Sequence, residues 1–381
     1  MAATEPRVRV TAGGLRGRLE SGVAVFKGIP FAEPPARFAA PGPVEGWDGT
    51  RDALSYGPPP PQSGLLGTDA VTESAGGWLT VNVWTPDPAA SLPVMVWIQG
   101  GGYVFGTSGR PEYDGGRLAR DGGVVVVTLN YRLGIEGFAR IDGAPANRGL
   151  LDQVAALEWV RDNISAFGGD PDQVTVFGQS AGGGSVAALL AMPRAAGLFR
   201  RAIVQSMPIV FVTPELAADV ARVLAAELGL SPAELDTVPP AELPAVGDAL
   251  MAKIDGYADR WGVVAHRRVP LGPVVDGATL PTDPWRALAG GAAGDVDLIA
   301  GHVRHEQRLF SLIEAPSAGS PRTRRRPRWT CSRPARTASP ATARPAAARR
   351  SCTTGSTPTG CSGCRRCISP RRTPAVPTST S

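Results

Sequence analysis

The segment Val174–Gly184 (VTVFGQSAGGG) has the residue types that a covalent hydrolytic reaction needs. A β-prone run leads into the pattern G-x-S-x-G centred on Ser180, and a helix rich in Ala and Leu is expected directly after it. The small residues Gly178 and Gly182 let the chain turn sharply, so that the serine hydroxyl stands above the end of the strand. The N-terminus of the following helix favours negative charge that develops there. We therefore predict a nucleophile at Ser180 rather than a serine that only caps the helix.

A second candidate element is the glycine run Gly100-Gly101-Gly102, which follows the apolar run Val94–Ile98. Consecutive glycines leave backbone N–H groups unshielded, as an oxyanion hole requires. The competing interpretation is a dinucleotide-binding turn, but G-x-G-x-x-G counted from Gly100 meets Phe105 at its last position. Together with the serine turn, the glycine run is better explained as an oxyanion loop than as a tight turn alone.

The third candidate is Glu306, in the loop that follows the apolar run Leu298–Ala300. A lone glutamate in a loop is ordinarily solvated surface. Hydrolases with a serine on a strand–turn–helix elbow, however, place their acid after the nucleophile, in the order Ser, Asp/Glu, His. This order makes Glu306 the candidate acid.

The elements around these residues predict an α/β-hydrolase fold, with a mostly parallel central sheet and helices on both faces. Apolar residues at helical spacing predict a helix over 150–164, with a glycine cap near Gly168. The first ninety residues are expected to form an antiparallel strand layer that leads into the main sheet, and residues 207–290 a helical cap inserted between two sheet strands. Five buried strands are expected at Val94–Ile98, Val124–Leu129, Val174–Phe177, Ala202–Gln205 and Leu298–Ala300.

At this point the chain resembles the type-B carboxylesterases, the group of cholinesterases and bacterial p-nitrobenzyl esterases, over roughly residues 7 to 314. The resemblance is carried by many ordered motifs: FKGIPFAEPP (Phe26–Pro35), LTVNVWTP (Leu79–Pro86), VMVWIQGGGYVFG (Val94–Gly106), VVVVTLNYRLGIEGF (Val124–Phe138), NRGLLDQVAALEWVRDNISAFGGDPDQVTVFGQSAGG (Asn147–Gly183), PVVDG (Pro273–Gly277) and the Glu306 loop.

The resemblance implies hydrolysis of small-molecule carboxylic esters without a cofactor or metal. It assigns Ser180 as the nucleophile, Glu306 as the triad acid, and the backbone N–H groups of Gly101, Gly102 and Ala181 as the oxyanion hole.

The sequence departs from the family pattern at four places. Gln179 replaces the usual glutamate before the serine, Gln99 stands where His or Tyr is common, and the cysteines of the family's early disulfide are absent. The last departure is the most serious: the family's histidine follows the acid, yet the only histidines are His266, His302 and His305, all before Glu306. We therefore assign no catalytic histidine and expect the chain to be impaired. A non-catalytic binding protein with a hydrolase fold is the alternative.

Composition divides the chain at residue 315. Residues 316–381 hold 14 arginines and all five cysteines, but no acidic residue, whereas the first 315 residues carry 25 basic and 34 acidic side chains. We expect residues 1–315 to form an incomplete hydrolase domain. We also expect a cytoplasmic protein, because no apolar run suits a signal peptide or a membrane span. The sequence does not indicate an oligomeric state.

The basic tail, residues 316–381, has no apolar periodicity, and its composition does not bury enough surface to fold alone. A change of reading frame explains best why all acids and all periodicity vanish at one point. The alternatives are a disordered basic arm for nucleic acid, which we do not expect, and a metal site at Cys361-x-x-Cys364-x-x-Cys367. The metal site lacks a recognisable fourth ligand.

Overall fold

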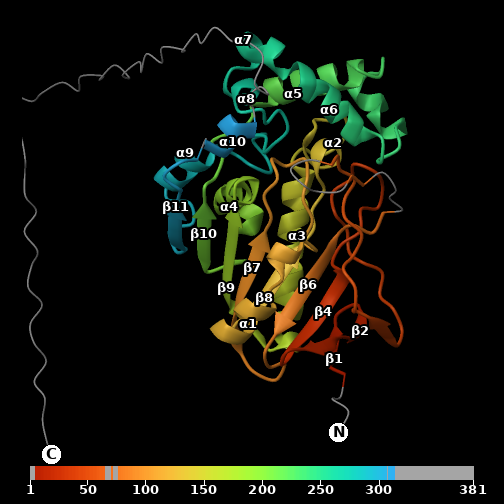
Figure 1. The fold of residues 1–381 in the computed structure, drawn as a ribbon, viewed down its shortest axis with the longest axis vertical. Coiled ribbons are helices and arrows are strands. Elements are labelled where there is room, and N and C mark those ends of the chain that lie inside the picture. Colours follow the sequence, from red (N-terminus) through yellow and green to blue (C-terminus); the bar gives the residue numbers. More distant parts are fainter. Residues whose placement is uncertain (1–4, 65–69, 72–75, 307, 314–381) are drawn as a thin grey trace, which may run out of the picture. The chain divides into compact units, whose positions relative to one another are not determined.

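A mixed β-sheet organises the part of the chain that the computed structural model describes, namely residues 5–64, 70–71, 76–306 and 308–313. These residues belong to the first of two units, Met1–Ala315, and the second unit, Pro316–Ser381, lies outside the described residues. The predictions for the basic tail therefore stay predictions. In the described residues, the order of the main sheet is β11 (Asp297–Gly301), β10 (Arg201–Gln205), β9 (Gly169–Gln179), β7 (Leu92–Ile98), β8 (Val125–Leu129), β6 (Thr80–Thr85), β4 (Val23–Pro30) and β3 (Arg18–Glu20) (Figure 1).

The five strands from β11 to β8 run parallel to one another, and β6, β4 and β3 continue the sheet in antiparallel pairs. All five strands predicted from apolar runs are present, and β9 is longer at both ends than its apolar core. The parallel pairing of these five strands confirms the prediction of a mostly parallel sheet. β8 is buried at all five positions, as expected for a continuous apolar run in a parallel strand. The prediction of a buried strand at Leu298–Ala300 is wrong, because every residue of β11 is exposed at the sheet edge.

Helices cover both faces of this sheet, as alternate residues of β8 demonstrate. Val125 and Val127 belong to the large core, together with residues of α3 and α4, whereas Val126 packs with Trp84 and with Ala119 of α1 in a separate cluster. Successive side chains of a strand point to opposite faces, so α1 lies on the face opposite α3 and α4. The described helices are α1 (Gly116–Gly122), α2 (Gly134–Phe138), α3 (Arg148–Asn163), α4 (Ala181–Ala191), α5 (Pro214–Ala226), α6 (Leu243–Lys253), α7 (Ala258–Trp261), α8 (Val263–His266), α9 (Pro284–Ala289) and α10 (Arg308–Ile313).

Two helix predictions hold in detail. The periodic segment forms α3, which continues as a 3-10 turn over Ile164–Phe167 and ends at Gly168 in the left-handed conformation (φ +74°). The inserted segment between β10 and β11 is helical, and α5 to α8 lie together beyond the carboxyl ends of the parallel strands (Figure 1). None of the described helices is long and apolar enough to cross a bilayer.

The N-terminal prediction is partly corrected. The strands β1 (Arg7–Val10) and β2 (Gly13–Arg16) pair antiparallel, but β5 (Thr50–Asp52) joins β2 in parallel, and these three form a small separate sheet. The strands β3, β4 and β6 lead into the main sheet in antiparallel pairs, as predicted. The first ninety residues are therefore divided between two sheets, because pairing partners distant in sequence cannot be read from local propensity.

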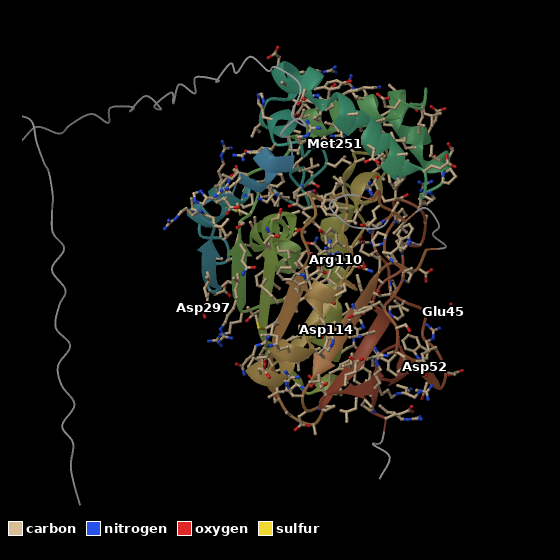
Figure 2. All side chains as sticks on the ribbon, viewed as in Figure 1. Glu45, Asp52, Arg110, Asp114, Met251 and Asp297 are labelled. Carbon is tan, nitrogen blue, oxygen red and sulfur yellow. The ribbon has the colours of Figure 1, made fainter. Side chains whose placement is uncertain are left out.

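The strand β11 lies at the edge of the described sheet and is unusual among its parallel strands. All five of its residues are exposed, and Ile299 retains 66% of its accessible surface. Its hydrogen-bonded neighbour is β10, and a long ion pair of 3.8 Å joins Asp297 to Arg201 at the start of the two strands. Asp297 marks this outer edge in Figure 2.

Candidate active site

Ser180 occupies a strained position between β9 and α4. Its backbone has φ +55° and ψ −125°, a combination that residues with a side chain rarely adopt and that costs on the order of 1–3 kcal/mol. Its N–H donates to the carbonyl oxygen of Gln205 at 3.0 Å, and its own carbonyl accepts from Gly184 at 2.9 Å. The predicted sharp turn is therefore present, with the serine one residue beyond the strand end.

Close packing explains the glycines around this turn. A methyl group on Gly182 would lie 2.0 Å from the carbonyl oxygen of Ile98, and one on Gly178 would lie 2.5 Å from the carbonyl carbon of Gly182. The chain reverses between β9 and α4 in direct contact with the end of β7. Glycine is required because any Cβ would force these backbones apart.

The glycine loop after β7 lies beside the serine. A methyl group on Gly100 would meet the Cβ atom of Ser180 at 3.2 Å. Gly101 and Gly102 have positive φ values of +112° and +60°, and their N–H groups make no hydrogen bond to the described residues. Ala181 is the first residue of α4, so its N–H has no partner within the helix. The three N–H groups thus belong to the two segments that flank Ser180, and the eleven-residue helix α4 directs its positive end toward this turn.

Glu306 lies in the loop after β11, at the same edge of the sheet. The carboxyl ends of the three strands are level, since Gln179 pairs in register with Gln205, and Gln205 with Gly301. Adjacent strands are roughly 4.8 Å apart, so the ends of β9 and β11 are separated by about 10 Å. Glu306 is half-buried, and its Oε1 accepts the N–H of Val303 at 2.8 Å. A separation of this size between the two strand ends leaves room for a further side chain between Ser180 and the Glu306 loop.

None of the three histidines joins Ser180 to Glu306 through hydrogen bonds among the described residues. The side chains of His266, His302 and His305 are exposed. Nδ1 of His302 lies 3.1 Å from the carbonyl oxygen of Val303, within its own loop. Ser180 therefore lies beside the glycine loop and at the start of α4, whereas the loop that carries Glu306 begins two strands away.

Two residues that the sequence did not single out also shape the site. Tyr131 is fully buried, and its hydroxyl donates to the carbonyl oxygen of Gln99 at 2.9 Å, directly before the glycine loop. Burial raises the pKa of the Tyr131 hydroxyl well above its ordinary value, which keeps it a donor. The N–H of Ser206 donates to Gly301 at 2.8 Å and ties the end of β10 to that of β11. Neither contact has a local sequence signal.

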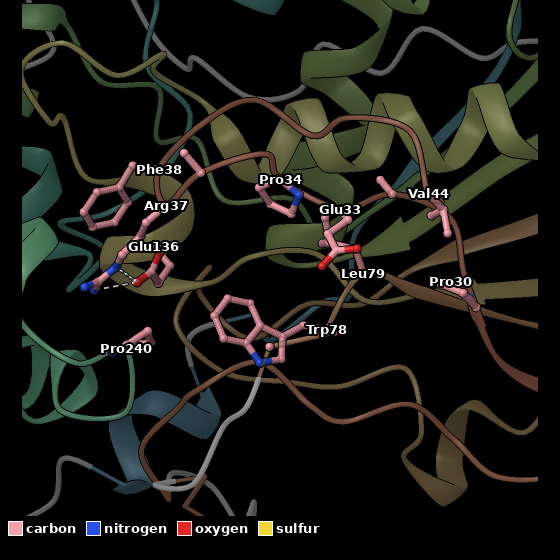
Figure 3. Close-up of a pocket in the computed structure, with 14 residues that line it drawn as sticks. Pro30, Glu33, Pro34, Arg37, Phe38, Val44, Trp78, Leu79, Glu136 and Pro240 are labelled. Atoms are coloured by element: carbon pink, nitrogen blue, oxygen red, sulfur yellow. Dashed lines mark hydrogen bonds and ion pairs between the residues drawn. The ribbon is translucent and has the colours of Figure 1, made fainter. Parts of the chain in front are cut away.

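A cavity of about 460 Å³ lies apart from these residues and has none of them in its lining (Figure 3). Arg37 reaches Glu136 there with an Nη2–Oε1 distance of 2.7 Å, and its Nη1 donates to the carbonyl of Asp236 in the cap at 2.6 Å. The hydrogen bond to Asp236 joins the N-terminal segment to the cap. Among the described residues, no group of three His, Cys, Asp or Glu side chains is arranged to hold a metal ion.

The parallel sheet, the serine elbow and the glycine loop at its carboxyl edge define the class of this protein as an α/β-hydrolase. More particularly, the chain belongs to the carboxylesterase family, whose model matches residues 4–342. This match passes the composition break near residue 315.

Similar proteins include the para-nitrobenzyl esterase of Bacillus subtilis (strain 168), 45% identical over 312 residues, which are 78% of this chain and 62% of that protein. The phenmedipham hydrolase of Pseudarthrobacter oxydans is 40% identical over 315 residues, 80% of this chain and 62% of that protein. A solved structure of a PNB esterase has a TM-score of 0.72 at 45% identity, covering 81% of this chain and 65% of that one. The chain thus spans less than two thirds of the length of these relatives.

Proposed function

We propose that this chain is the serine-bearing part of a carboxylesterase that hydrolyses small-molecule carboxylic esters through an acyl-enzyme on Ser180. The observation that carries the proposal is a strained serine beside the backbone N–H groups of Gly101, Gly102 and Ala181, which make no hydrogen bond to the described part of the chain. Such donors stabilise the oxyanion of a tetrahedral intermediate in acyl transfer. The similarity to esterases in the relatives supports the same chemistry.

In the proposed reaction, Oγ of Ser180 bonds to the ester carbonyl carbon, and the carbonyl oxygen becomes an anion facing the three N–H groups. The C–O bond to the alcohol then breaks, and the alcohol leaves with the serine proton. Water attacks the acyl-enzyme, the acid is released, and the proton returns to Ser180. Glu306 is proposed as the acid that orients the base.

Transfer of the Ser180 proton requires a base. No histidine follows Glu306 in the sequence. Removing the histidine from a serine–histidine–acid triad costs on the order of 10⁶-fold in turnover. We therefore propose that the chain by itself turns over slowly, for want of a proton acceptor and not for want of a nucleophile or an oxyanion hole. The cytoplasmic location expected from the sequence stays a prediction.

Chemical rescue tests this proposal. Free imidazole is added to the purified chain with p-nitrophenyl acetate, and p-nitrophenol release is followed at increasing imidazole concentrations. We expect imidazole to raise the rate above that of the Ser180→Ala variant, and an acetyl group to be found by mass spectrometry on the peptide that contains Ser180. Ser165→Ala, at an exposed serine, is the matched control and should behave like the parent chain. Equal imidazole-dependent rates in the parent and in Ser180→Ala would refute the proposal.

A further inference from the structure

A buried carboxamide, that of Gln62, binds Gly106 beside the glycine loop, although the two residues lie far apart in sequence. Gln62 is 2% exposed, and its Oε1 accepts the N–H of Gly106 at 2.8 Å. Its Nε2 donates to the carbonyl oxygen of Gly106 at 3.1 Å and to that of Pro60 at 3.2 Å. The side chain therefore pairs with both polar groups of Gly106, as a neighbouring strand would, and its amide is fully used.

Gly106 in turn lies against the start of the glycine loop. Its φ of +122° requires glycine, and a methyl group placed on it would be 3.0 Å from the carbonyl oxygen of Gly100. The carbonyl of Gly100 and the N–H of Gly101 belong to one planar peptide unit, so fixing the direction of one fixes the other. The contact at Gly106 thus bears directly on a proposed oxyanion donor.

The neighbouring peptide units have supports of their own. The carbonyl of Gln99 accepts from Tyr131, and that of Gly101 accepts from the N–H groups of Val104 and Phe105 at 3.0 and 3.1 Å. The carbonyl of Gly100 accepts no hydrogen bond from the described residues. Its orientation depends on packing against Gly106, which Gln62 holds in place.

We propose that Gln62 is a positioning residue of the oxyanion hole, acting through Gly106 on the peptide unit that carries the N–H of Gly101. The backbone of Gln62 is itself anchored, because the N–H of Val71 donates to its carbonyl at 2.8 Å. A carboxamide suits this role because it offers one donor and one acceptor side by side, which methionine and ionised glutamate do not. The inference rests on the proposed function for its effect on catalysis, but not for its effect on the loop.

Hydrogen exchange with mass spectrometry tests the loop without any need for activity. We expect exchange in the peptide spanning residues 99–106 to be about tenfold faster in Gln62→Met than in the parent chain, because two hydrogen bonds to Gly106 are lost. Gln173→Met is the matched control, since Gln173 pairs with Asp170 near the opposite end of β9 and does not touch the loop. In Gln62→Glu, protection of the same peptide should recover from about pH 7 to about pH 4, since a protonated carboxyl again offers a donor and an acceptor.

The imidazole-rescued esterase assay adds a catalytic readout. We expect kcat of Gln62→Met to fall by roughly 10- to 100-fold with KM nearly unchanged, because the oxyanion donor acts mainly in the transition state. Unchanged exchange of residues 99–106 in both Gln62 variants, relative to Gln173→Met, would overturn the inference. If the parent chain shows no activity dependent on Ser180, the proposed function fails while the exchange data still decide the role of Gln62.

Discussion

Gly182 lies in the first turn of α4, where the helix passes closest to the carboxyl end of β7. A Cβ at this position would stand 2.0 Å from the carbonyl oxygen of Ile98 and 3.0 Å from the carbonyl carbon of Gln99. Both contacts involve backbone, which has no rotamer by which to give way. The substitution Gly182→Ala must therefore separate α4 from β7 by on the order of 1 Å before the contact becomes tolerable.

The size of the effect follows from this displacement. Overpacking of a filled interior costs about 1–3 kcal/mol, and we expect a loss of folding stability at the upper end of that range. The same movement carries Ser180 and Ala181 away from Gly101, and a misplacement of about 1 Å can lower a reaction rate by about 10²-fold. Stability and rescued activity should therefore fall together.

Gly247 provides the matched comparison. It lies within α6, and a Cβ placed there would meet no atom within 4 Å. Gly247→Ala should stabilise the protein by about 0.4–1 kcal/mol, because alanine restricts the unfolded chain and suits a helix. Urea unfolding followed by circular dichroism measures both variants. If Gly182→Ala is as stable as Gly247→Ala, the packing argument for the elbow is wrong.

Two further predictions concern buried charge and buried hydroxyls. In the folded protein, buried Arg132 pairs with Asp152 at 2.7 Å. Asp152→Ala removes this partner and leaves the arginine charge buried, so it should destabilise the fold by about 3–5 kcal/mol in urea unfolding. Glu158→Ala, at an exposed pair, should change stability by less than about 1 kcal/mol. Burial raises the pKa of Tyr103 and Tyr131 above the ordinary tyrosine value. As the pH rises, the unfolded chain therefore loses these two protons before the folded chain does. The free energy of unfolding should fall as the pH rises above about 10. The urea midpoint should lose less between about pH 9 and pH 11 in the Tyr103→Phe/Tyr131→Phe double variant, and an equal loss in parent and double variant would contradict the assignment.

Local patterns predict those parts of the fold in which neighbours in sequence decide the structure. The elbow at Ser180 is such a case, because a β-branched run, two small residues and an apolar helix are all read within a dozen residues. The parallel strands are another, since each is marked by a short run of apolar and β-branched residues. The positions of Ser180 and the glycine loop at one sheet edge follow from these two signals together.

Contacts between distant segments leave no such pattern. Gln62 meets Gly106 across 44 residues, and Tyr131 meets Gln99 across 32. A glutamine after a run of prolines and a tyrosine after a strand are ordinary in sequence, and only the folded backbone brings them to the glycine loop. The parallel pairing of β5 with β2 was missed for the same reason. The rescue experiment decides the assignment of Ser180, and the assignments of Glu306 and the oxyanion donors stay predictions.

The exposed strand β11 has a consequence for the order in which the protein loses its structure. Free energies of local opening are lowest where few apolar contacts are buried, and all five residues of β11 are exposed. The loop that carries Glu306 begins at the end of this strand, whereas Ser180 and the glycine loop are attached to the buried strands β7 and β9. On mild denaturation, β11 should therefore open first and remove the carboxylate, while the nucleophile and its oxyanion donors remain assembled on the intact centre of the sheet.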